Sequence, residues 1–128
     1  MTIIDKITKQ VFTSSSPLAS TYEKVYLISD YIDLTVVAVN GDTVNDITLS
    51  VDRFNSEETR PSSIPNPANG SEYLVSDFSG SVGLKSGNNA TKVVSITNNT
   101  FTHLKVKLVP AASINDARIE VWGRRIPK

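Results

Sequence analysis

Residues 36–54 read VVAVNGDTVNDITLSVDRF, which is two apolar runs separated by a polar stretch. In the second run, residues 47–51 alternate between apolar and polar side chains, so one face of an extended strand packs inward and the other meets water. The first run is apolar on both faces, as in a central strand that is covered on each side. The stretch therefore predicts two β-strands and a protein built on β-sheet.

Two places between these runs suit a tight hairpin turn. Asn40-Gly41 accepts the positive φ values that such a turn requires, and the chain turns equally well further on, around Asn45-Asp46. We expect the two runs to pair as a hairpin through one of these turns. Such a hairpin is a scaffold element, and function must come from what is attached to it.

Short β-branched and aromatic runs, separated by turn residues, continue through the rest of the chain. From Tyr22 onward they read YEKVYLI, IDLTVVAVN, DITLSVDRF, EYLVS, KVVSIT, HLKVKLV and ARIEVWGRR. Runs of this length and spacing are typical of antiparallel sandwiches. We therefore expect an all-β protein, an antiparallel β-sandwich of jelly-roll or Ig-like type with about seven to eight short strands.

We expect the sandwich to occupy residues 21–128 as a single domain. The residues before it, 1–20, have Ile4, Ile7 and Val11 at helical spacing but no convincing helix cap. They are predicted to form an N-terminal arm that docks on a neighbouring subunit, or a short helix.

Two polar stretches within the predicted domain are too long for ordinary turns. The first, residues 55–71, is rich in Ser, Asn and Pro, and a connection of that length is usually functional or disordered. The second, SDFSGSVGLKSGNNA at residues 76–90, is rich in Gly and Ser. Both are predicted to be loops.

The composition excludes several classes of function. Thirteen Lys and Arg balance thirteen Asp and Glu, and cysteine is absent. The long-range positive field that specific nucleic-acid binding needs is therefore missing, and so are disulfides and thiolate metal sites. No apolar run is long enough to span a membrane, and no signal peptide precedes the first strand. We expect a protein that is made in the host cytoplasm and binds neither membrane nor specific nucleic acid.

Catalytic and cofactor signatures are also weak. His103 is the single histidine of the chain, so a transition-metal site cannot be assembled from histidines. The pattern that positions a nucleophilic serine is absent, as are the glycine patterns of nucleotide-binding loops. Glu57 and Glu58 are adjacent in a polar loop and are interpreted as solvated charges. We expect no enzyme activity and no cofactor.

Aromatic side chains leave a second possibility open. In the last predicted strand, Trp122 falls on the same face as Glu120 and Arg118, the face expected to meet solvent. Together with Tyr31 and Tyr73 it provides a platform for stacking sugars or bases, or else these rings pack against the arm, a loop or another subunit.

The chain as a whole, from ITKQVFTSSSPLAS through the β runs to IEVWGRRIPK, resembles the minor structural proteins of tailed-bacteriophage virions in its overall texture. These are capsid decoration or cement proteins and small head or tail adaptor proteins. The resemblance implies a non-enzymatic virion protein that self-associates, with a trimer favoured, and that binds the major capsid protein or other virion proteins.

The same resemblance implies that the arm, the 55–71 loop and the last strand make the contacts. The candidate interface residues are Ile4, Ile7, Val11, Phe12, Arg60, Trp122, Arg124 and Arg125. The alternative is a carbohydrate- or receptor-binding β-sandwich module, in which an exposed tryptophan stacks on a sugar ring of a glycan.

Overall fold

The computed structural model describes residues 1–55, 75–85 and 90–127, and this part of the chain forms antiparallel β-strands and no helix. The strands are β1 (Ile3–Phe12), β2 (Tyr22–Leu27), β3 (Asp33–Asn40), β4 (Ile47–Phe54), β5 (Val75–Ser81), β6 (Ala90–Ile96), β7 (His103–Pro110) and β8 (Ala117–Arg125). Across the described ranges, no segment is a helix of the length and apolarity needed to cross a membrane. The prediction of an all-β sandwich of about seven to eight strands is confirmed.

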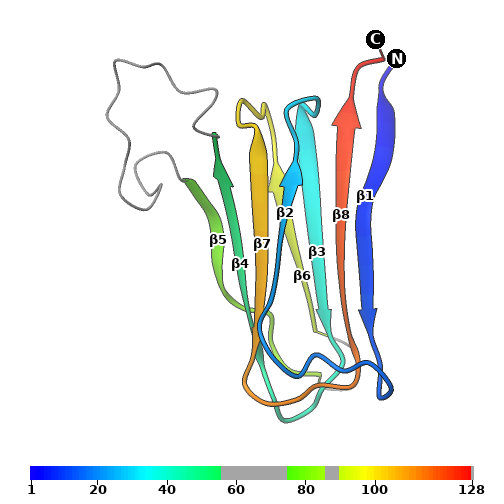
Figure 1. Cartoon of the computed structure of the whole chain (residues 1–128), viewed down its shortest axis with the longest axis vertical. Helices are drawn as coiled ribbons and strands as arrows, with labels where there is room; N and C mark the ends of the chain where they lie inside the picture. Colours follow the sequence, from blue (N-terminus) through cyan, green and yellow to red (C-terminus); the bar gives the residue numbers. More distant parts are fainter. Residues whose placement is uncertain (56–74, 86–89, 128) are drawn as a thin grey trace.

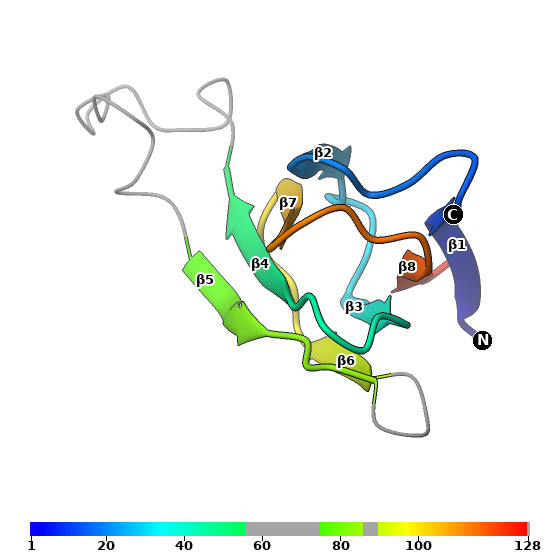
Figure 2. The ribbon, with the colours of Figure 1, turned by 90° about the horizontal axis from the view of Figure 1, so that it is seen from below.

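The strands form two four-stranded sheets that face each other (Figure 1, Figure 2). The first sheet has the order β1-β8-β3-β6 and the second has the order β2-β7-β4-β5. Each strand of the first half therefore pairs with its counterpart from the second half: β1 with β8, β2 with β7, β3 with β6, and β4 with β5. Successive pairs alternate between the sheets, which is the connectivity of a jelly roll rather than of an Ig-like sandwich.

The inner faces of the two sheets share one hydrophobic core. The alternation predicted for residues 47–51 is observed, because Ile47, Leu49 and Val51 are each no more than 1% exposed. Leu104, Val106 and Leu108 on the neighbouring β7 are buried in the same way. Burial of each such side chain contributes roughly 1.5–3 kcal/mol, so the inward-facing rows hold the sheets together.

The predicted hairpin at residues 36–54 is wrong. Its two runs belong to different sheets, β3 between β8 and β6 and β4 between β7 and β5, so residues 41–46 cross from one sheet to the other. Neither Asn40 nor Gly41 has a positive φ. Instead the buried Asn40 amide nitrogen donates to the carbonyls of Asn45 and Gly83, at 3.0 and 2.7 Å. The alternation indicated which side chains face inward, but it carries no information about which strand lies alongside.

The prediction of an arm or a short helix for residues 1–20 is also wrong, because residues 3–12 are the edge strand β1 of the first sheet. The register with β8 shifts between Lys6 and Thr8. Such a bulge inserts one residue and interrupts the period-two alternation. Ile7 consequently packs against the core, whereas Ile4 and Val11 on the same strand stay exposed. Because of this interruption, Ile4, Ile7 and Val11 have the spacing that is also found on one face of a helix.

The second predicted loop is partly strand. Residues 75–81 form β5, which pairs with β4 and places Phe78 opposite Val51 and against the core. The Ser and Gly content concealed this edge strand, because serine and glycine are poor strand formers. The first predicted loop, residues 55–71, lies outside the described residues except for Asn55.

A network of polar groups fastens the end of the sandwich at which β1 begins and β8 ends (Figure 1). The guanidinium of Arg53 binds Asp77 through two hydrogen bonds, Nε to Oδ2 at 2.6 Å and Nη2 to Oδ1 at 2.9 Å, and donates to the side-chain oxygen of Asn99 at 3.1 Å. The Asn99 amide nitrogen donates to the carbonyls of Ile28 and Tyr31. The loop after β6 is thereby tied to the loop before β3, and both border the site described next.

Candidate functional site: the outer face around Trp122

The outer face of the first sheet carries the single tryptophan of the chain. On β8, Ile119 and Val121 are fully buried, so the residues between and after them point away from the core. The prediction that Trp122 shares an outward face with Glu120 and Arg118 is confirmed. Trp122 is half-buried on that face.

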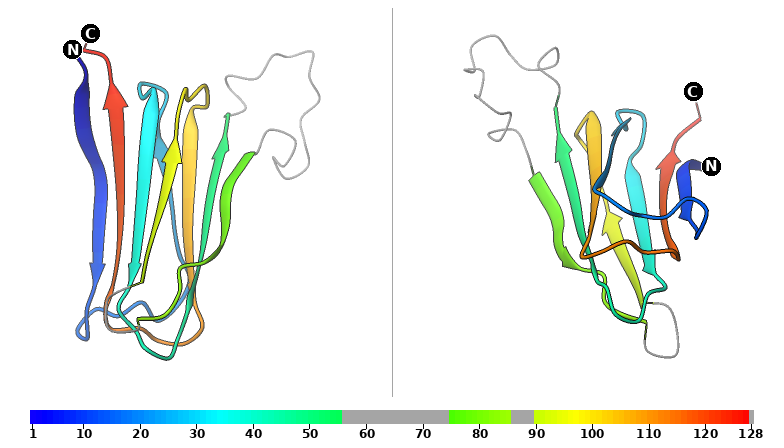
Figure 3. Two further views of the ribbon diagram at one scale, coloured as in Figure 1. Left: turned by 180° about the vertical axis from the view of Figure 1, so that it is seen from behind. Right: turned by 60° about the horizontal axis from the view of Figure 1, so that its bottom comes forward.

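Strand pairing brings residues from four strands into one row with Trp122. Trp122 lies opposite Lys6 of β1 on one side and Thr35 of β3 on the other, and Thr35 in turn lies opposite Ser95 of β6. Figure 3 (left) shows these strands side by side. Because paired residues point to the same side of a sheet, the indole and two hydroxyl groups share one surface.

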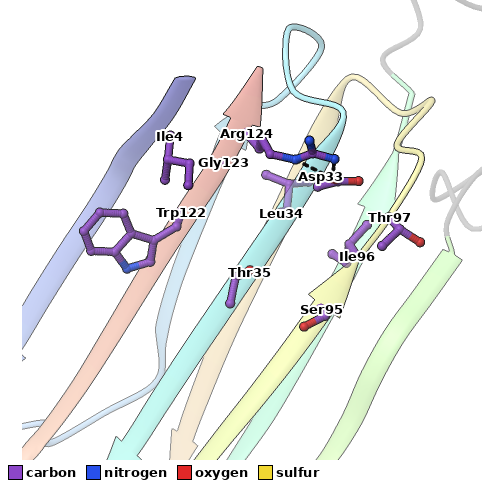
Figure 4. A pocket seen from close by; sticks show the side chains of 10 residues that line it. All are labelled: Ile4, Asp33, Leu34, Thr35, Ser95, Ile96, Thr97, Trp122, Gly123 and Arg124. Atoms are coloured by element: carbon purple, nitrogen blue, oxygen red, sulfur yellow. Dashed lines mark hydrogen bonds and ion pairs between the residues drawn. The ribbon is translucent and has the colours of Figure 1, made fainter. Parts of the chain in front are cut away.

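A shallow hollow of about 290 Å³ opens on this surface, at the end where β8 terminates. We call it the Trp122 hollow; its lining includes Ile4, Thr35, Ser95, Thr97 and Trp122. In the close-up, the indole ring is seen broadside next to Ile4, while the side chains of Thr35 and Ser95 come from the adjacent strands (Figure 4). The hollow therefore has an apolar side on β1 and β8 and a hydroxyl-bearing side on β3 and β6.

An ion pair closes one end of the hollow. The guanidinium of Arg124 binds Asp33, with Nε 2.7 Å from Oδ2 and a further contact through Nη2 (Figure 4). These hydrogen bonds from Arg124, together with one from the backbone N–H of Asn98, hold the pKa of Asp33 below its usual value. Asp33 therefore stays ionised and paired, and this end of the hollow carries no net charge.

A second group of polar contacts holds the indole. Nε1 of Trp122 donates to Oε1 of Glu120 at 3.2 Å. The other oxygen of Glu120 lies 2.7 Å from Nε of Arg118, as an ion pair without hydrogen-bond geometry. The edge of the indole is thus engaged by the protein, which leaves the ring face as its free surface.

The hollow contains three hydroxyl groups, those of Thr35, Ser95 and Thr97. Within the ranges that the structure describes, the side chains of Thr35, Ser95 and Thr97 make no hydrogen bond to the protein. Serine and threonine hydroxyls are both donors and acceptors. Three such groups beside an aromatic ring form a surface that can bind a polar, uncharged ligand.

The candidate interface residues of β1 divide between core and surface. Phe12 is only 7% exposed and packs edge-on against Tyr22, and Ile7 is partly buried against the core, so both side chains are used within the domain. The reason is the strand pairing of β1, which turns these positions inward. Ile4 and Val11 are 67% and 47% exposed on the outer face.

The candidate interface residues of β8 lie at or near the Trp122 hollow, and both arginines form ion pairs within the chain. Trp122 lines the hollow, and Arg124 is paired with Asp33. Arg125 donates to Oδ2 of Asp5 on β1 at 2.6 Å. Arg60 lies outside the described residues.

His103 packs against an aromatic ring and lies beside a hydroxyl group. Its ring stacks on Phe54, with centroids 5.1 Å apart and planes 15° apart, and its Nδ1 lies 2.7 Å from the hydroxyl of Thr102. No cluster of three His, Asp or Glu side chains suited to a metal ion occurs in the described parts of the chain.

Three residues of the hollow were not predicted from the sequence: Thr35, Ser95 and Thr97. The alternation of residues 34–38 places Thr35 outward, but nothing in the sequence indicates that it lies beside Trp122. The pairing joins positions that are far apart in the chain, and no local pattern reports such a contact.

No protein-family model matches this chain, and no curated protein matches it either. Among solved structures, the SPBc2 prophage-derived protein YomS is similar over 97% of this chain and 96% of its own, at 15% identity and a TM-score of 0.49. A chain of the infectious bursal disease virus Gt strain matches 97% of this chain and 30% of its own, at 12% identity and a TM-score of 0.40. TmCBM61, solved in complex with beta-1,4-galactotriose, matches 98% of this chain and 88% of its own, at 8% identity and a TM-score of 0.40. Likeness at this level concerns backbone shape and carries no information about function.

Proposed function

We propose that this chain is a non-enzymatic structural protein of a viral or phage particle, which self-associates and binds the particle through exposed side chains of its rigid sandwich. The observation that carries the self-association is a pair of exposed apolar residues on the edge strand β2. Val25 is 50% exposed and Leu27 is 67% exposed. Two residues apart on a strand, they lie on the same outer face of the second sheet.

The neighbourhood of this pair extends the apolar surface. Leu27 lies opposite His103 on β7, which lies opposite Phe54 on β4, and the two rings stack on each other. Leu27, His103 and Phe54 form a row across the sheet, which we call the Leu27 row. Contiguous apolar surface at the edge of a sheet is a feature of protein contact sites.

The charges beside the row do not oppose contact between copies. Lys105 lies 3.6 Å from Glu23 across the same strands, so the two side chains balance each other. An exposed pair of this kind contributes little to stability. Association through the row is therefore expected to depend on apolar burial and to change little with salt.

Placement in a particle is supported by the overall character of the chain, which is a small, cysteine-free β domain with long stretches rich in Ser, Pro and Asn. Repeated contacts between copies of one rigid domain build closed assemblies. The proposal includes contact with other virion proteins, for which detection of the chain in purified particles is the direct check.

The test of self-association is sedimentation velocity and light scattering on the full chain across a concentration series. Leu27→Lys is expected to weaken association about tenfold or more, equivalent to ~1.4 kcal/mol, because it places a charge in an apolar contact. Val93→Lys is the matched control, since Val93 is 53% exposed on the edge strand β6 of the other sheet. A monomer at every concentration, or equal effects of the two variants, contradicts self-association through this row.

A second candidate function, a carbohydrate- or receptor-binding module, is favoured by the Trp122 hollow. The hollow and the Leu27 row lie on the outer faces of different sheets. One chain can therefore use one face for assembly and the other for a ligand. Loss of glycan binding on Trp122→Ala, with unchanged assembly, is the outcome that this candidate predicts.

A further inference from the structure

We infer that the Trp122 hollow binds one neutral pyranose ring, stacked on the indole and hydrogen-bonded at its rim by the hydroxyl of Thr35, while the hydroxyls of Ser95 and Thr97 line the far side of the hollow. The inference rests on the second candidate function and adds the class of ligand and the role of each side chain. It does not depend on self-association through Leu27.

The platform is the face of the indole. A pyranose presents C–H groups on its ring faces, and these contacts are favourable on the electron-rich face of an aromatic ring. The hydrogen bond from Trp122 Nε1 to Glu120 holds the ring by its edge. Figure 4 looks onto the outer face and shows the ring broadside, so its face is presented to a ligand. A ring that is already oriented loses little conformational entropy on binding.

The hydroxyl of Thr35 lies on the strand next to the indole, within reach of the rim of a stacked sugar, and those of Ser95 and Thr97 lie further out. Neighbouring strands are about 4.8 Å apart, and Thr35 is one strand away from Trp122, with Ser95 one strand further. Both side chains project from the same face as the indole (Figure 4). Each hydroxyl can donate to or accept from a sugar hydroxyl, which is the pairing that a polyol ligand requires.

The charges that line the hollow favour a neutral ligand, because Arg124 is paired with Asp33. Lys6 lies opposite Trp122 on β1 but is not part of the lining. No guanidinium in the hollow is therefore free to hold a carboxylate, a sulfate or a phosphate. The volume of about 290 Å³ is near the lower end of the range of about 300–1,000 Å³ for small-ligand sites, which fits a single sugar ring rather than a long chain.

A sugar fits this hollow better than an apolar side chain of a protein partner does. Covering the hollow with an apolar group removes water from three hydroxyls and offers them no replacement partner. Buried polar groups without hydrogen bonds are costly. A ring with hydroxyls along its rim satisfies both sides of the hollow at once.

The experiment is a titration of the full, isotope-labelled chain, followed by two-dimensional ¹H–¹⁵N NMR. The probes are methyl β-D-glucopyranoside, methyl β-D-galactopyranoside, methyl α-D-mannopyranoside and N-acetyl-D-glucosamine. At least one probe is expected to give saturable shifts at the Trp122 indole N–H and at the amides of Thr35, Ser95 and Thr97. The expected Kd is on the order of 1 mM, as for a weak single-ring contact.

Four variants separate the roles of the side chains. Trp122→Ala is expected to weaken binding about tenfold or more, and Trp122→Phe, which keeps an aromatic face, is expected to retain most of it. Thr35→Val keeps the shape and the strand preference but removes the hydroxyl, and should weaken binding several-fold. Val44→Ala, an exposed apolar truncation in the connection between β3 and β4, is the control and should leave binding unchanged.

The outcomes distinguish the inference from the function on which it rests. Saturable binding whose shifts lie elsewhere, and which Trp122→Ala leaves unchanged, overturns the hollow as the site while the carbohydrate-binding role survives. The absence of saturable shifts with all four probes overturns both. Tighter binding of methyl β-D-glucuronoside than of the neutral glucoside overturns the assignment of a neutral ligand. The spectra themselves report whether each variant is folded.

Discussion

The ring of Tyr31 lies against the backbone of Gly123 so closely that a Cβ at residue 123 would stand 2.4 Å from Cδ1 of the tyrosine. The hydroxyl of the same tyrosine donates to Oδ2 of Asp5 at 3.0 Å. The loop before β3 is thereby attached to the pair β1 and β8 on their core side, behind the Trp122 hollow that Gly123 also lines. Glycine at position 123 is required by this close approach and not by an unusual φ.

Gly123→Ala is expected to lower the free energy of unfolding by about 1–3 kcal/mol, because the added methyl group displaces the Tyr31 ring from its packed position. Urea denaturation followed by tryptophan fluorescence measures the change. A double-mutant cycle with Tyr31→Ala provides the control, since the clash is removed when the ring is absent. If Gly123→Ala costs the same in the Tyr31→Ala background, the proposed steric cause is incorrect.

Asn40 is the basis of a second prediction, because its fully buried side chain joins three segments. Its amide nitrogen donates to the carbonyls of Asn45 and Gly83, and its oxygen accepts from the backbone N–H of Asp42 at 2.9 Å. Asn40→Ala leaves these groups without partners and is expected to cost about 2–4 kcal/mol. Thermal or urea unfolding checks the value.

The matched control for Asn40 is another asparagine that lacks this role. Asn98 is exposed and has a φ of 52°, a value that glycine adopts without strain. Asn98→Gly is expected to change stability by less than about 0.5 kcal/mol. Comparable losses for the two variants would show that the buried amide network is not what makes Asn40 important.

Acid should weaken the contact between β1 and β8. The hydrogen bond from Arg125, followed by that from Tyr31, holds the pKa of Asp5 below its usual value. Burial, followed by the neighbouring Asp5, raises the pKa of Tyr31, so the tyrosine keeps the proton that it donates. A carboxyl whose pKa is lower in the folded state contributes stability above its unfolded pKa of about 3.9. That contribution is lost as the pH falls through the lowered folded pKa.

Urea midpoints measured between about pH 7 and pH 2 check this prediction. The fall in stability below about pH 4 should be shallower in Asp5→Asn than in the parent protein, since asparagine does not titrate. Asp33→Asn should act in the same direction, because Arg124 lowers the pKa of Asp33. An unchanged acid profile in both variants would contradict the assigned role of these ion pairs.

The inward-facing side chains of this fold could be predicted to a large extent from the sequence. The alternation at Ile47, Leu49 and Val51 indicated a half-buried strand, and the same pattern at residues 117–123 turned Trp122 outward. Both expectations hold, because alternation is a local property of an extended chain with one face in a core. The jelly-roll connectivity could not be distinguished from an Ig-like one at this level, and the predicted hairpin paired the wrong strands.

The strand β1 and the Trp122 hollow could not be predicted from local sequence patterns. The bulge near Ile7 disrupts the alternation of β1, so its strand character depends on the ladder that β8 supplies. Thr35 and Ser95 become part of one surface with Trp122 only through pairing between distant strands.

The amino-acid sequence alone thus specified a cysteine-free, charge-balanced β domain and the face on which its tryptophan lies. The tertiary structure alone decided which strands are neighbours, and with them the Trp122 hollow and the Leu27 row. The physical reason is that burial patterns are set within a few residues along the chain. Strand partners are decided by the packing of whole sheets, in which the paired strands are separated by dozens of residues along the chain.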